Sequence, residues 1–224
     1  MIIGLTGAAG SGKDSVADAL VAEHGFQRIA FADCLYEEVS TAFNVPIDFL
    51  KNRDTKESPT PRLALGCCAD EEFCRVVMRV CGVSWWTAIM WGWKSAWRWR
   101  SWSPRQILQW WGTDYRRSQR GDYWIAQVRN RITQDPGDWV ITDVRFQNEA
   151  DLVQELGGQL GLVLRPGIEP VANHVSEEFW QTCSPDIVIQ NDGTLEGLQS
   201  TVNVIVTMAD RFICGNTKKG ARND

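Results

Sequence analysis

The sequence lacks any apolar run of the roughly 20 residues that an α-helix needs to span a bilayer. Its first stretch, Met1 to Gly7, has no basic group before the apolar residues and so does not resemble a signal peptide. It also lacks a basic excess: the formal net charge is −5, whereas coating DNA non-specifically needs a clustered basic surface. We therefore expect a cytoplasmic protein (host cytoplasm if viral) with no membrane segment and no stable nucleic-acid partner.

The seven cysteines lack the paired C-x-x-C spacing that is typical of zinc sites. Cys67, Cys68, Cys74 and Cys81 form the densest group. In a reducing compartment they are expected to be free thiols. Because Cys74 and Cys81 are seven residues apart, on one face of a predicted helix, we interpret them as small buried apolar residues rather than metal ligands.

What is present is an ordinary globular composition, with 224 residues of which 44% are hydrophobic and 23% charged. No internal repeat is visible. Apolar runs predict strands, and helical periodicity predicts helices, in alternation along the chain. The predicted strands are 1–6, 27–32, 139–143, 161–164 and 186–190; the predicted helices are 12–23, 35–43, 70–82, 104–118, 122–132, 146–156 and 194–212. This order predicts a three-layer α-β-α fold with a mostly parallel sheet.

The strongest motif follows the first predicted strand: Gly7-Ala8-Ala9-Gly10-Ser11-Gly12-Lys13-Asp14-Ser15. It fits the phosphate-loop pattern G-x-x-x-x-G-K, in which backbone N–H groups, a helix N-terminus and the lysine surround phosphates. Its place between a strand and an amphipathic helix argues against an ordinary glycine-rich turn. We predict that ATP is bound by Gly7, Gly10, Ser11, Gly12, Lys13, Asp14 and Ser15.

Asp14 stands where the usual pattern has serine or threonine. A carboxylate beside phosphates is repelled unless a cation intervenes, so Asp14 could hold Mg²⁺ together with Ser15. Alternatively, Asp14 only caps or orients the loop, and the sequence leaves both interpretations open.

At this point the sequence resembles the deoxynucleoside monophosphate kinases of bacteriophages, which belong to the P-loop nucleoside monophosphate kinase-like family. The matching stretches are Gly12 to Ser15, 31–33, 103–106 with 112–114, 143–149 and 191–195. The resemblance implies a P-loop kinase domain over residues 1–214, with a helical insertion and lid at about 66–134 and a polar tail at 215–224. It also implies transfer of the γ-phosphate of ATP to a deoxynucleoside monophosphate, with Mg²⁺.

The resemblance also implies an acceptor site. Asp143 ends a predicted strand, and Arg145 and Glu149 follow four residues apart, which as a bare pattern could be a surface ion pair. By resemblance, Asp143 lies near the Mg²⁺–phosphate centre, Arg145 binds phosphate and Glu149 contacts the acceptor nucleoside. Lys13, Arg105, Asp143 and Arg145 are the predicted catalytic residues. The predicted acceptor-binding residues are Arg105, Gly112, Thr113, Trp124, Asp143, Arg145 and Glu149.

By resemblance to related kinases, Arg116, Arg117 and Arg120 near the end of helix 104–118 belong to a lid, where transfer between two polyanions needs cations. Each of them could instead be a solvated surface residue. Trp124 could stack on the acceptor base, as the resemblance implies, or lie in the core, since it is on the apolar side of its helix.

Seven of the twelve tryptophans lie within residues 83–102, among basic residues. Such a stretch could bind single-stranded nucleic acid or a membrane surface, or it could pack on the body or across a homodimer interface. The acidic net charge favours packing. We expect His174 to be a surface or supporting residue.

The leading hypothesis is thus a deoxynucleoside monophosphate kinase with ATP and the monophosphate as its small-molecule partners. One alternative is another small-molecule P-loop kinase, since Gly4 to Gly7 and Gly10 to Lys13 also resemble dephospho-coenzyme A kinase. A second is a non-catalytic nucleotide-binding protein that engages DNA or a partner through its tryptophans.

Overall fold

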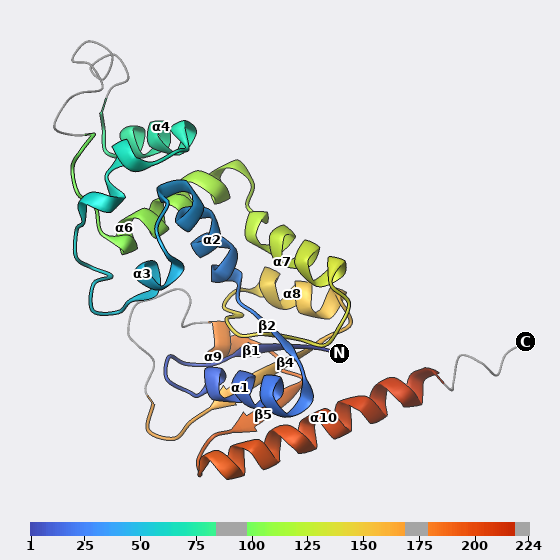
Figure 1. Ribbon diagram of the computed structural model, residues 1–224. Coiled ribbons are helices and arrows are strands. Elements are labelled where there is room, and N and C mark those ends of the chain that lie inside the picture. Colours follow the sequence, from blue (N-terminus) through green and yellow to red (C-terminus); the bar gives the residue numbers. More distant parts are fainter. Residues whose placement is uncertain (84–97, 169–178, 218–224) are drawn as a thin grey trace, which may run out of the picture. The chain divides into compact units, whose positions relative to one another are not determined.

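The computed structural model describes residues 1–83, 98–168 and 179–217 (Figure 1). The chain divides into two compact units, one made of Met1–Ala30 with Arg129–Asp224 and the other of Phe31–Val128. We call these the sheet unit and the helical unit. The single domain predicted over residues 1–214 stays a prediction.

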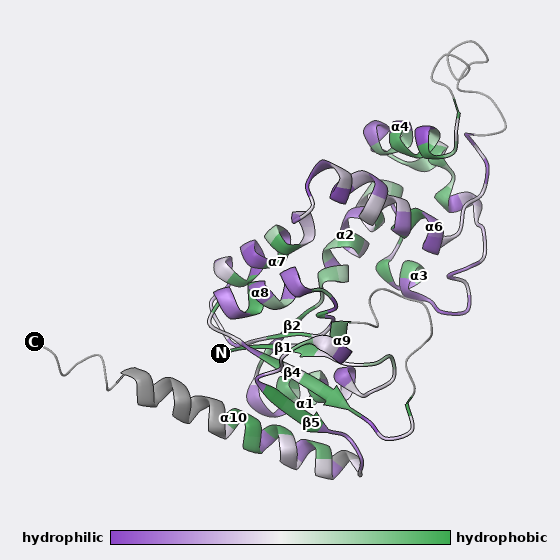
Figure 2. Cartoon of the chain, turned by 180° about the vertical axis from the view of Figure 1, so that it is seen from behind, coloured by the Kyte–Doolittle hydropathy of each residue, from purple (hydrophilic) through white to green (hydrophobic). Residues whose placement is uncertain are grey.

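The sheet unit contains five parallel strands in the order β2-β3-β1-β4-β5. They are β1 (Ile2–Thr6), β2 (Gln27–Ile29), β3 (Trp139–Ile141), β4 (Gln159–Leu164) and β5 (Ile187–Gln190). Figure 2 shows how hydrophobic these strands are, as expected for a parallel sheet that is covered on both faces. The predicted α/β fold is confirmed, and the sheet is wholly parallel within the described residues.

Helices cover both faces of this sheet (Figure 1). On one face lie α1 (Lys13–His24) and α10 (Leu195–Thr217); on the other lies α8 (Gln147–Glu155). Two successive residues of β1 face the helices on opposite sides of the sheet. A Cβ at Gly4 would collide with Val153 of α8, whereas Leu5 packs with Val16 and other residues of α1. The three layers are therefore held by apolar contacts on both sides of β1.

The helical unit is built around aromatic side chains. Its elements are α2 (Phe31–Phe43), α3 (Ile47–Lys51), α4 (Glu71–Val80), α6 (Pro104–Gln109), a π-helix (Trp110–Arg117) and the first part of α7 (Tyr123–Gln134), with 3₁₀ turns at Pro61–Leu63 and Leu65–Cys67. Phe73 of α4 lies 4.5 Å from Trp111 and 5.7 Å from Tyr115 between ring centroids. Phe43 of α2 meets Phe73 edge-on at 6.1 Å. These rings join three helices into one core.

Local sequence signals set several helix ends as predicted. Ser103 and Gln106 form a capping box at the start of α6, with Pro104 in the first turn. Thr194 accepts a hydrogen bond of 3.2 Å from the N–H of Gly197 and so caps α10.

The short α9 (Phe179–Thr182) completes the described elements.

The second strand is shorter than predicted. It ends at Ile29 rather than at residue 32, and α2 already begins at Phe31. At the edge of the sheet that the described residues form, β2 pairs with β3 over three residues. Asp33 then lies in the first turn of α2, where a negative charge stabilises a helix.

Two further predictions need correction, and residues 44–62, where no element was predicted, contain α3 with its fully buried Leu50 and the start of a 3₁₀ turn. The helix predicted over 104–118 changes to a π-helix at Trp110. Cys81 is not a buried apolar residue: α4 ends at Val80, and Cys81 is exposed whereas Cys74 is buried. The described cysteines form no disulfide, and no group of three or more His, Cys, Asp or Glu among the described residues is placed to hold a metal.

Tryptophans 85, 86, 91, 93 and 97, and also His174, lie outside the described residues. Of the remaining two in that stretch, Trp102 is buried and meets Trp110 edge-on at 4.8 Å, while Trp99 is 57% exposed. No helix in the described part of the chain is both long enough and apolar enough to cross a membrane.

Candidate active site

The phosphate loop leaves β1 at Thr6 and enters α1 at Lys13. Gly7 and Gly12 have φ values of 143° and 101°, a region that residues with a side chain rarely adopt. Both are also too crowded for a Cβ atom. At Gly7 it would collide with the carbonyl oxygen of Val163, and at Gly12 with the side-chain nitrogen of Asn191. Backbone conformation therefore favours glycine at both positions, and at Gly7 the backbone of Val163 also leaves no space for a side chain.

Lys13 reaches back over this loop. Its Nζ donates hydrogen bonds of 2.7 Å to the carbonyl oxygens of Gly7 and Ala8. The ammonium group thus lies beside the loop backbone, at the positive end of α1. Because the first N–H groups of a helix have no partner within it, the same place offers unpaired donors to an anion.

Ser11 supports this interpretation independently. The residue is 1% exposed, and its Oγ has no hydrogen-bond partner among the described residues. The hydroxyl lies beside Gly7, 3.0 Å from where a Cβ of that glycine would be. A buried hydroxyl without a partner is unfavourable and rare, so an acceptor such as a phosphate oxygen fits this position.

Asp14 is turned toward β2. Its carboxylate forms an ion pair with Arg28, which also donates to Asp18 at 2.7 Å. The Asp14 side chain is 77% exposed, and that of Arg28 is 37% exposed. The arginine therefore compensates for a carboxylate that would otherwise repel phosphates.

The stretch after β3 lies against β1. The N–H of Val144 donates to the carbonyl oxygen of Leu5 at 3.1 Å, which continues the parallel pairing of these strands. Asp143 is half-buried at this point and Arg145 is exposed. The structure therefore brings residues 142–146 close to the start of the phosphate loop, at the carboxyl edge where parallel sheets bind ligands.

Glu149 is not half of a simple surface pair. It is 4% exposed, and its Oε2 accepts a hydrogen bond of 2.8 Å from the backbone N–H of Arg145. The buried carboxylate thus holds the turn that carries the Arg145 side chain. Sequence reasoning placed Glu149 at the site but missed this backbone contact.

The other predicted site residues belong to the helical unit. Arg105 is 60% exposed and pairs with Glu57, while its backbone N–H donates to the Lys56 carbonyl at 3.0 Å. Arg120 is exposed and donates to Asp122 at 2.6 Å. Arg117 is exposed as well. These three guanidinium groups are at the surface of their unit.

Gly112 and Trp124 are in contact. The Nε1 of Trp124 donates to the Gly112 carbonyl oxygen at 3.2 Å, and Trp124 is 5% exposed. The bond joins α7 to the π-helix that also carries Thr113, and π-helical turns are frequent at functional sites. Of the two interpretations of Trp124, its burial favours the core one.

Arg116 is enclosed rather than free. Its Nε donates to Glu38 at 2.7 Å, and its guanidinium lies 4.4 Å from the ring centre of Tyr115 and 5.0 Å from that of Tyr123. Glu38 also accepts hydrogen bonds from Trp111 Nε1 at 2.7 Å and from the Tyr123 hydroxyl at 2.6 Å. Sequence reasoning missed Glu38, which joins α2 to the π-helix and α7.

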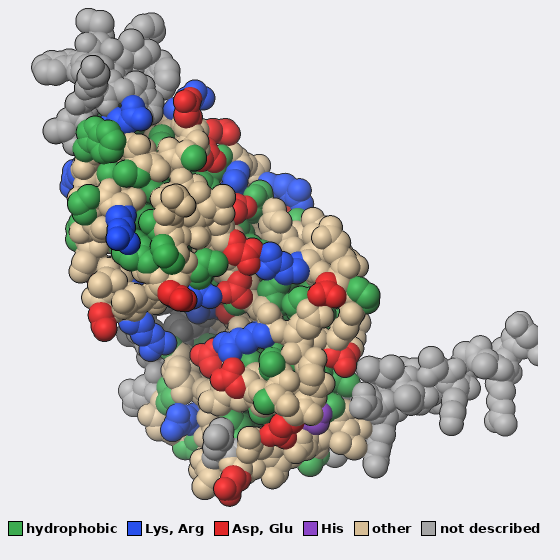
Figure 3. Space-filling view, viewed as in Figure 1, with side chains coloured by type: hydrophobic (Ala, Val, Ile, Leu, Met, Phe, Trp, Pro, Cys, Tyr) green, Lys and Arg blue, Asp and Glu red, His purple; other side chains and the backbone are tan. Residues whose placement is uncertain are grey.

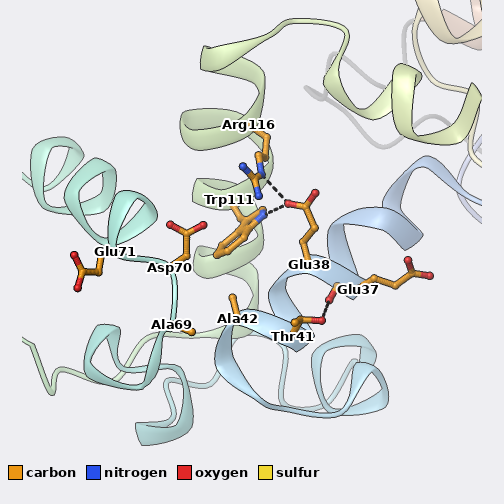
Figure 4. Close-up of a pocket in the computed structure, with 9 residues that line it drawn as sticks. All are labelled: Glu37, Glu38, Thr41, Ala42, Ala69, Asp70, Glu71, Trp111 and Arg116. Carbon is orange, nitrogen blue, oxygen red and sulfur yellow. Dashed lines mark hydrogen bonds and ion pairs between the residues drawn. The ribbon is translucent and has the colours of Figure 1, made fainter. Parts of the chain in front are cut away.

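Figure 4 shows Glu38, Trp111 and Arg116 of this cluster, which line a pocket of about 800 Å³. The pocket is lined by Glu37, Glu38, Thr41, Ala42, Ala69, Asp70, Glu71, Trp111 and Arg116. Two of its carboxylates are already engaged: Glu38 has three donors, and Asp70 accepts from the N–H of Phe73 and from Tyr115. We therefore interpret the Glu38 and Asp70 groups as stabilising this unit.

A phosphate loop at the carboxyl edge of a parallel, three-layer sheet is the arrangement of the P-loop class of proteins. A model of the deoxynucleotide monophosphate kinase family matches residues 88–202. A putative deoxynucleotide monophosphate kinase of Acanthamoeba polyphaga mimivirus is 30% identical over 227 residues, covering 95% of this chain and 99% of that protein. The chain belongs to the deoxynucleotide monophosphate kinase family.

Two phage proteins match over shorter stretches. The deoxynucleotide monophosphate kinase of Escherichia phage RB69 is 30% identical over 115 residues, 47% of this chain and 46% of that protein. The enzyme of the same name from Enterobacteria phage T4 is 28% identical over 106 residues, 45% of this chain and 44% of that protein. These relatives confirm the predicted family and the assignment of the chain as a kinase.

Proposed function

We propose that this kinase takes the γ-phosphate of ATP and transfers it to a deoxynucleoside monophosphate, releasing ADP and a deoxynucleoside diphosphate. One observation carries the proposal: the loop after β1 combines glycines with positive φ, a lysine and a buried hydroxyl that has no hydrogen-bond partner among the described residues. An oxyanion is the ligand that fits the glycine-shaped loop, the lysine and the buried hydroxyl together. Family membership supports the choice of a deoxynucleotide as acceptor.

The donor phosphates are held by the loop. We assign Gly7, Gly10 and Gly12 to shaping the backbone, and Ser11 and Lys13 to direct contact. In the structure Lys13 is bonded to two loop carbonyls. When ATP binds, the ammonium exchanges these neutral acceptors for charged phosphate oxygens, which form stronger hydrogen bonds.

Mg²⁺ fits the oxygen groups that lie near this loop, because hard cations prefer hydroxyl, carboxylate and phosphate oxygens. We propose that Ser15 and Asp143 hold the ion together with the nucleotide. Asp14 is already paired with Arg28, so we assign it to orienting the start of α1. When bound, Mg²⁺ neutralises charge on the β- and γ-phosphates.

We propose that the acceptor monophosphate is bound by Arg105 and Arg145, whose exposed guanidinium groups can each grip a phosphate. Glu149 holds the Arg145 turn. Gly112, Thr113 and Trp124 shape the acceptor side of the site. As lid cations we propose Arg117 and Arg120, whereas the enclosed Arg116 stabilises the helical unit.

An acceptor panel tests the proposed reaction. ADP release is measured with ATP, Mg²⁺ and, in separate reactions, dGMP, dTMP, dCMP, dAMP and dephospho-coenzyme A. We expect turnover with at least one deoxynucleoside monophosphate. Turnover with dephospho-coenzyme A alone would replace the proposal by the other kinase activity, and binding of ATP without turnover on any acceptor would make the chain a non-catalytic nucleotide-binding protein.

The Lys13→Ala variant tests the assigned loop. Loss of one charge-stabilising donor in an active site reduces turnover by a factor of about 10²–10³ or more. Arg129→Ala is the matched control, because it also removes one cation from the sheet unit but lies in an exposed pair with Glu155. Lys13→Ala activity within a few-fold of the control would contradict the assignment.

We further propose that the protein acts in the cytoplasm on its two small-molecule substrates without a stable nucleic-acid complex. The net charge of −5 supports this, and on the face drawn in Figure 3 basic side chains are interspersed with acidic ones. The homodimer stays a prediction that light scattering can check.

A further inference from the structure

Asn191 connects the far edge of the sheet to the phosphate loop. It follows β5 directly, and its backbone N–H donates to the Leu164 carbonyl at 2.7 Å, which extends the pairing of β4 and β5. Its side-chain Nδ2 donates to the backbone carbonyl oxygen of Ser11 at 2.8 Å. The two residues are 180 positions apart in the chain. The end of β5 is thus joined to the middle of the loop by a hydrogen bond.

This contact controls the direction of one peptide group. The carbonyl of Ser11 and the N–H of Gly12 belong to the same trans peptide, so they point in opposite directions. Holding the carbonyl on Asn191 therefore aims the Gly12 N–H away from β5. Gly12 has a φ of 101°, and its neighbour Asn191 leaves no room for a Cβ there. The peptide is consequently fixed by both a hydrogen bond and close packing.

We propose that Asn191 is a positioning residue, which sets the Ser11–Gly12 peptide so that the loop N–H groups face the donor phosphates. The inference rests on the proposed function, since it assigns ATP to this loop. Its chemistry requires a neutral donor at position 191. A carboxylate there would face the Ser11 carbonyl oxygen with like charge and would add negative charge close to the phosphates.

The contact could also be purely structural, so the test must separate the two roles. A residue that only stabilises the fold changes the unfolding temperature and affects both substrates alike. A residue that sets the phosphate loop changes the affinity for ATP and leaves the KM for the deoxynucleoside monophosphate unchanged. The test is therefore a comparison of the two substrates, made on folded protein.

The experiment uses Asn191→Asp and Asn191→Ala in the full chain. Asn203→Asp is the matched control, because it makes the same chemical change elsewhere in the sheet unit. The Oδ1 of Asn203 forms a hydrogen bond of 2.6 Å with Nε2 of His24. The dissociation constant of a non-hydrolysable ATP analogue is measured by calorimetry without acceptor, and both KM values are measured by ADP release. Loss of one hydrogen bond changes affinity about 2- to 13-fold, and repulsion adds to this for aspartate.

We expect the dissociation constant to rise about fivefold in Asn191→Ala and at least tenfold in Asn191→Asp, with the acceptor KM and the control within twofold of wild type. The proposal is overturned if Asn191→Asp binds the analogue within twofold of wild type, if both KM values rise together, or if wild type does not bind the analogue. If Asn191→Asp does not fold, Asn191→Ala decides alone. Since binding is measured without acceptor, a failed acceptor panel leaves this result interpretable.

Discussion

The carboxylate of Glu149 accepts a hydrogen bond of 2.8 Å from the backbone N–H of Arg145. This contact joins the first turn of α8 to the turn that follows β3. Since Glu149 is 4% exposed, the bond forms where water competes little, and a bond from an N–H to a carboxylate is stronger than one between neutral groups. The position of the exposed Arg145 side chain therefore depends on a buried acid.

Glu149→Gln should lower kcat/KM for the deoxynucleoside monophosphate about tenfold, because it weakens the bond that holds the Arg145 turn. The KM for ATP should stay within about twofold. Glu149→Ala, which leaves the N–H without its partner, should in addition lower the free energy of unfolding by about 1–3 kcal/mol. Steady-state kinetics and urea unfolding measure these effects.

Glu155→Gln is the control for this pair of variants, since it changes an exposed glutamate of the same helix that pairs with Arg129. Its kinetics should match wild type. Equal kinetics of Glu149→Gln and Glu155→Gln would show that the Arg145 turn needs no charged acceptor.

Asp14→Asn tests which oxygen groups hold Mg²⁺. Because the Asp14 carboxylate faces Arg28 in an exposed pair, we expect the free energy of unfolding to change by less than about 1 kcal/mol. The Mg²⁺ concentration for half-maximal activity should stay within about threefold, since a carboxylate held by an arginine contributes little to metal binding. Ser15→Ala should raise it about tenfold. The reverse order of these two effects would assign the metal to Asp14.

The elements with strong local signals were predicted well. The phosphate loop was found because its glycines and lysine are adjacent in sequence, and the starts of α6 and α10 were found because capping residues act over three or four positions. The predicted end of β2 was wrong, because an edge strand ends where its partner strand ends. The end of the partner strand β3 is at Ile141, which pairs with Ile29 and lies 112 residues further along the chain, so no local pattern near β2 could show it.

Contacts between distant residues could not be predicted from the same patterns. The bond from Asn191 to Ser11 depends on the order of β1, β4 and β5, which a list of elements does not determine. One signal was available: Asn191 follows a strand, at the edge where ligands bind. Likewise, no local pattern distinguishes the enclosed Arg116 from the exposed Arg117, since only the folded unit places Glu38 beside one of them.

Glu38→Ala should destabilise the helical unit strongly. It leaves the half-buried Arg116 without its carboxylate and removes the acceptor of Trp111 Nε1 and the Tyr123 hydroxyl, for a cost of about 3–5 kcal/mol. Glu71→Ala is the control, because Glu71 lines the same pocket but its ion pair with Arg75 is exposed and worth less than about 0.5 kcal/mol. Urea unfolding followed by tryptophan fluorescence compares the two, and similar midpoints would contradict the role of Glu38.

Tyr115 should make stability depend on pH in the alkaline range. Burial, and secondly the hydrogen bond from its hydroxyl to Asp70 at 2.9 Å, raise the pKa of Tyr115 to about 12 from an ordinary value near 10. Because the folded pKa is higher than the unfolded one, the neutral phenol stabilises the fold. This contribution is complete below about pH 10 and is lost as the pH rises through about 12.

The measurement is the difference in unfolding free energy between wild type and Tyr115→Phe, from pH 8 to pH 12. Wild type should be more stable by about 1.5–3 kcal/mol at pH 8, since the Tyr115 hydroxyl donates a hydrogen bond to the charged carboxylate of Asp70. The difference should shrink above pH 10, and phenolate absorbance should lose a late-titrating component in Tyr115→Phe. The comparison is needed because burial and a bond to Glu38 also raise the pKa of Tyr123. A difference that stays constant up to pH 12 would mean that Tyr115 titrates equally in the folded and unfolded chain.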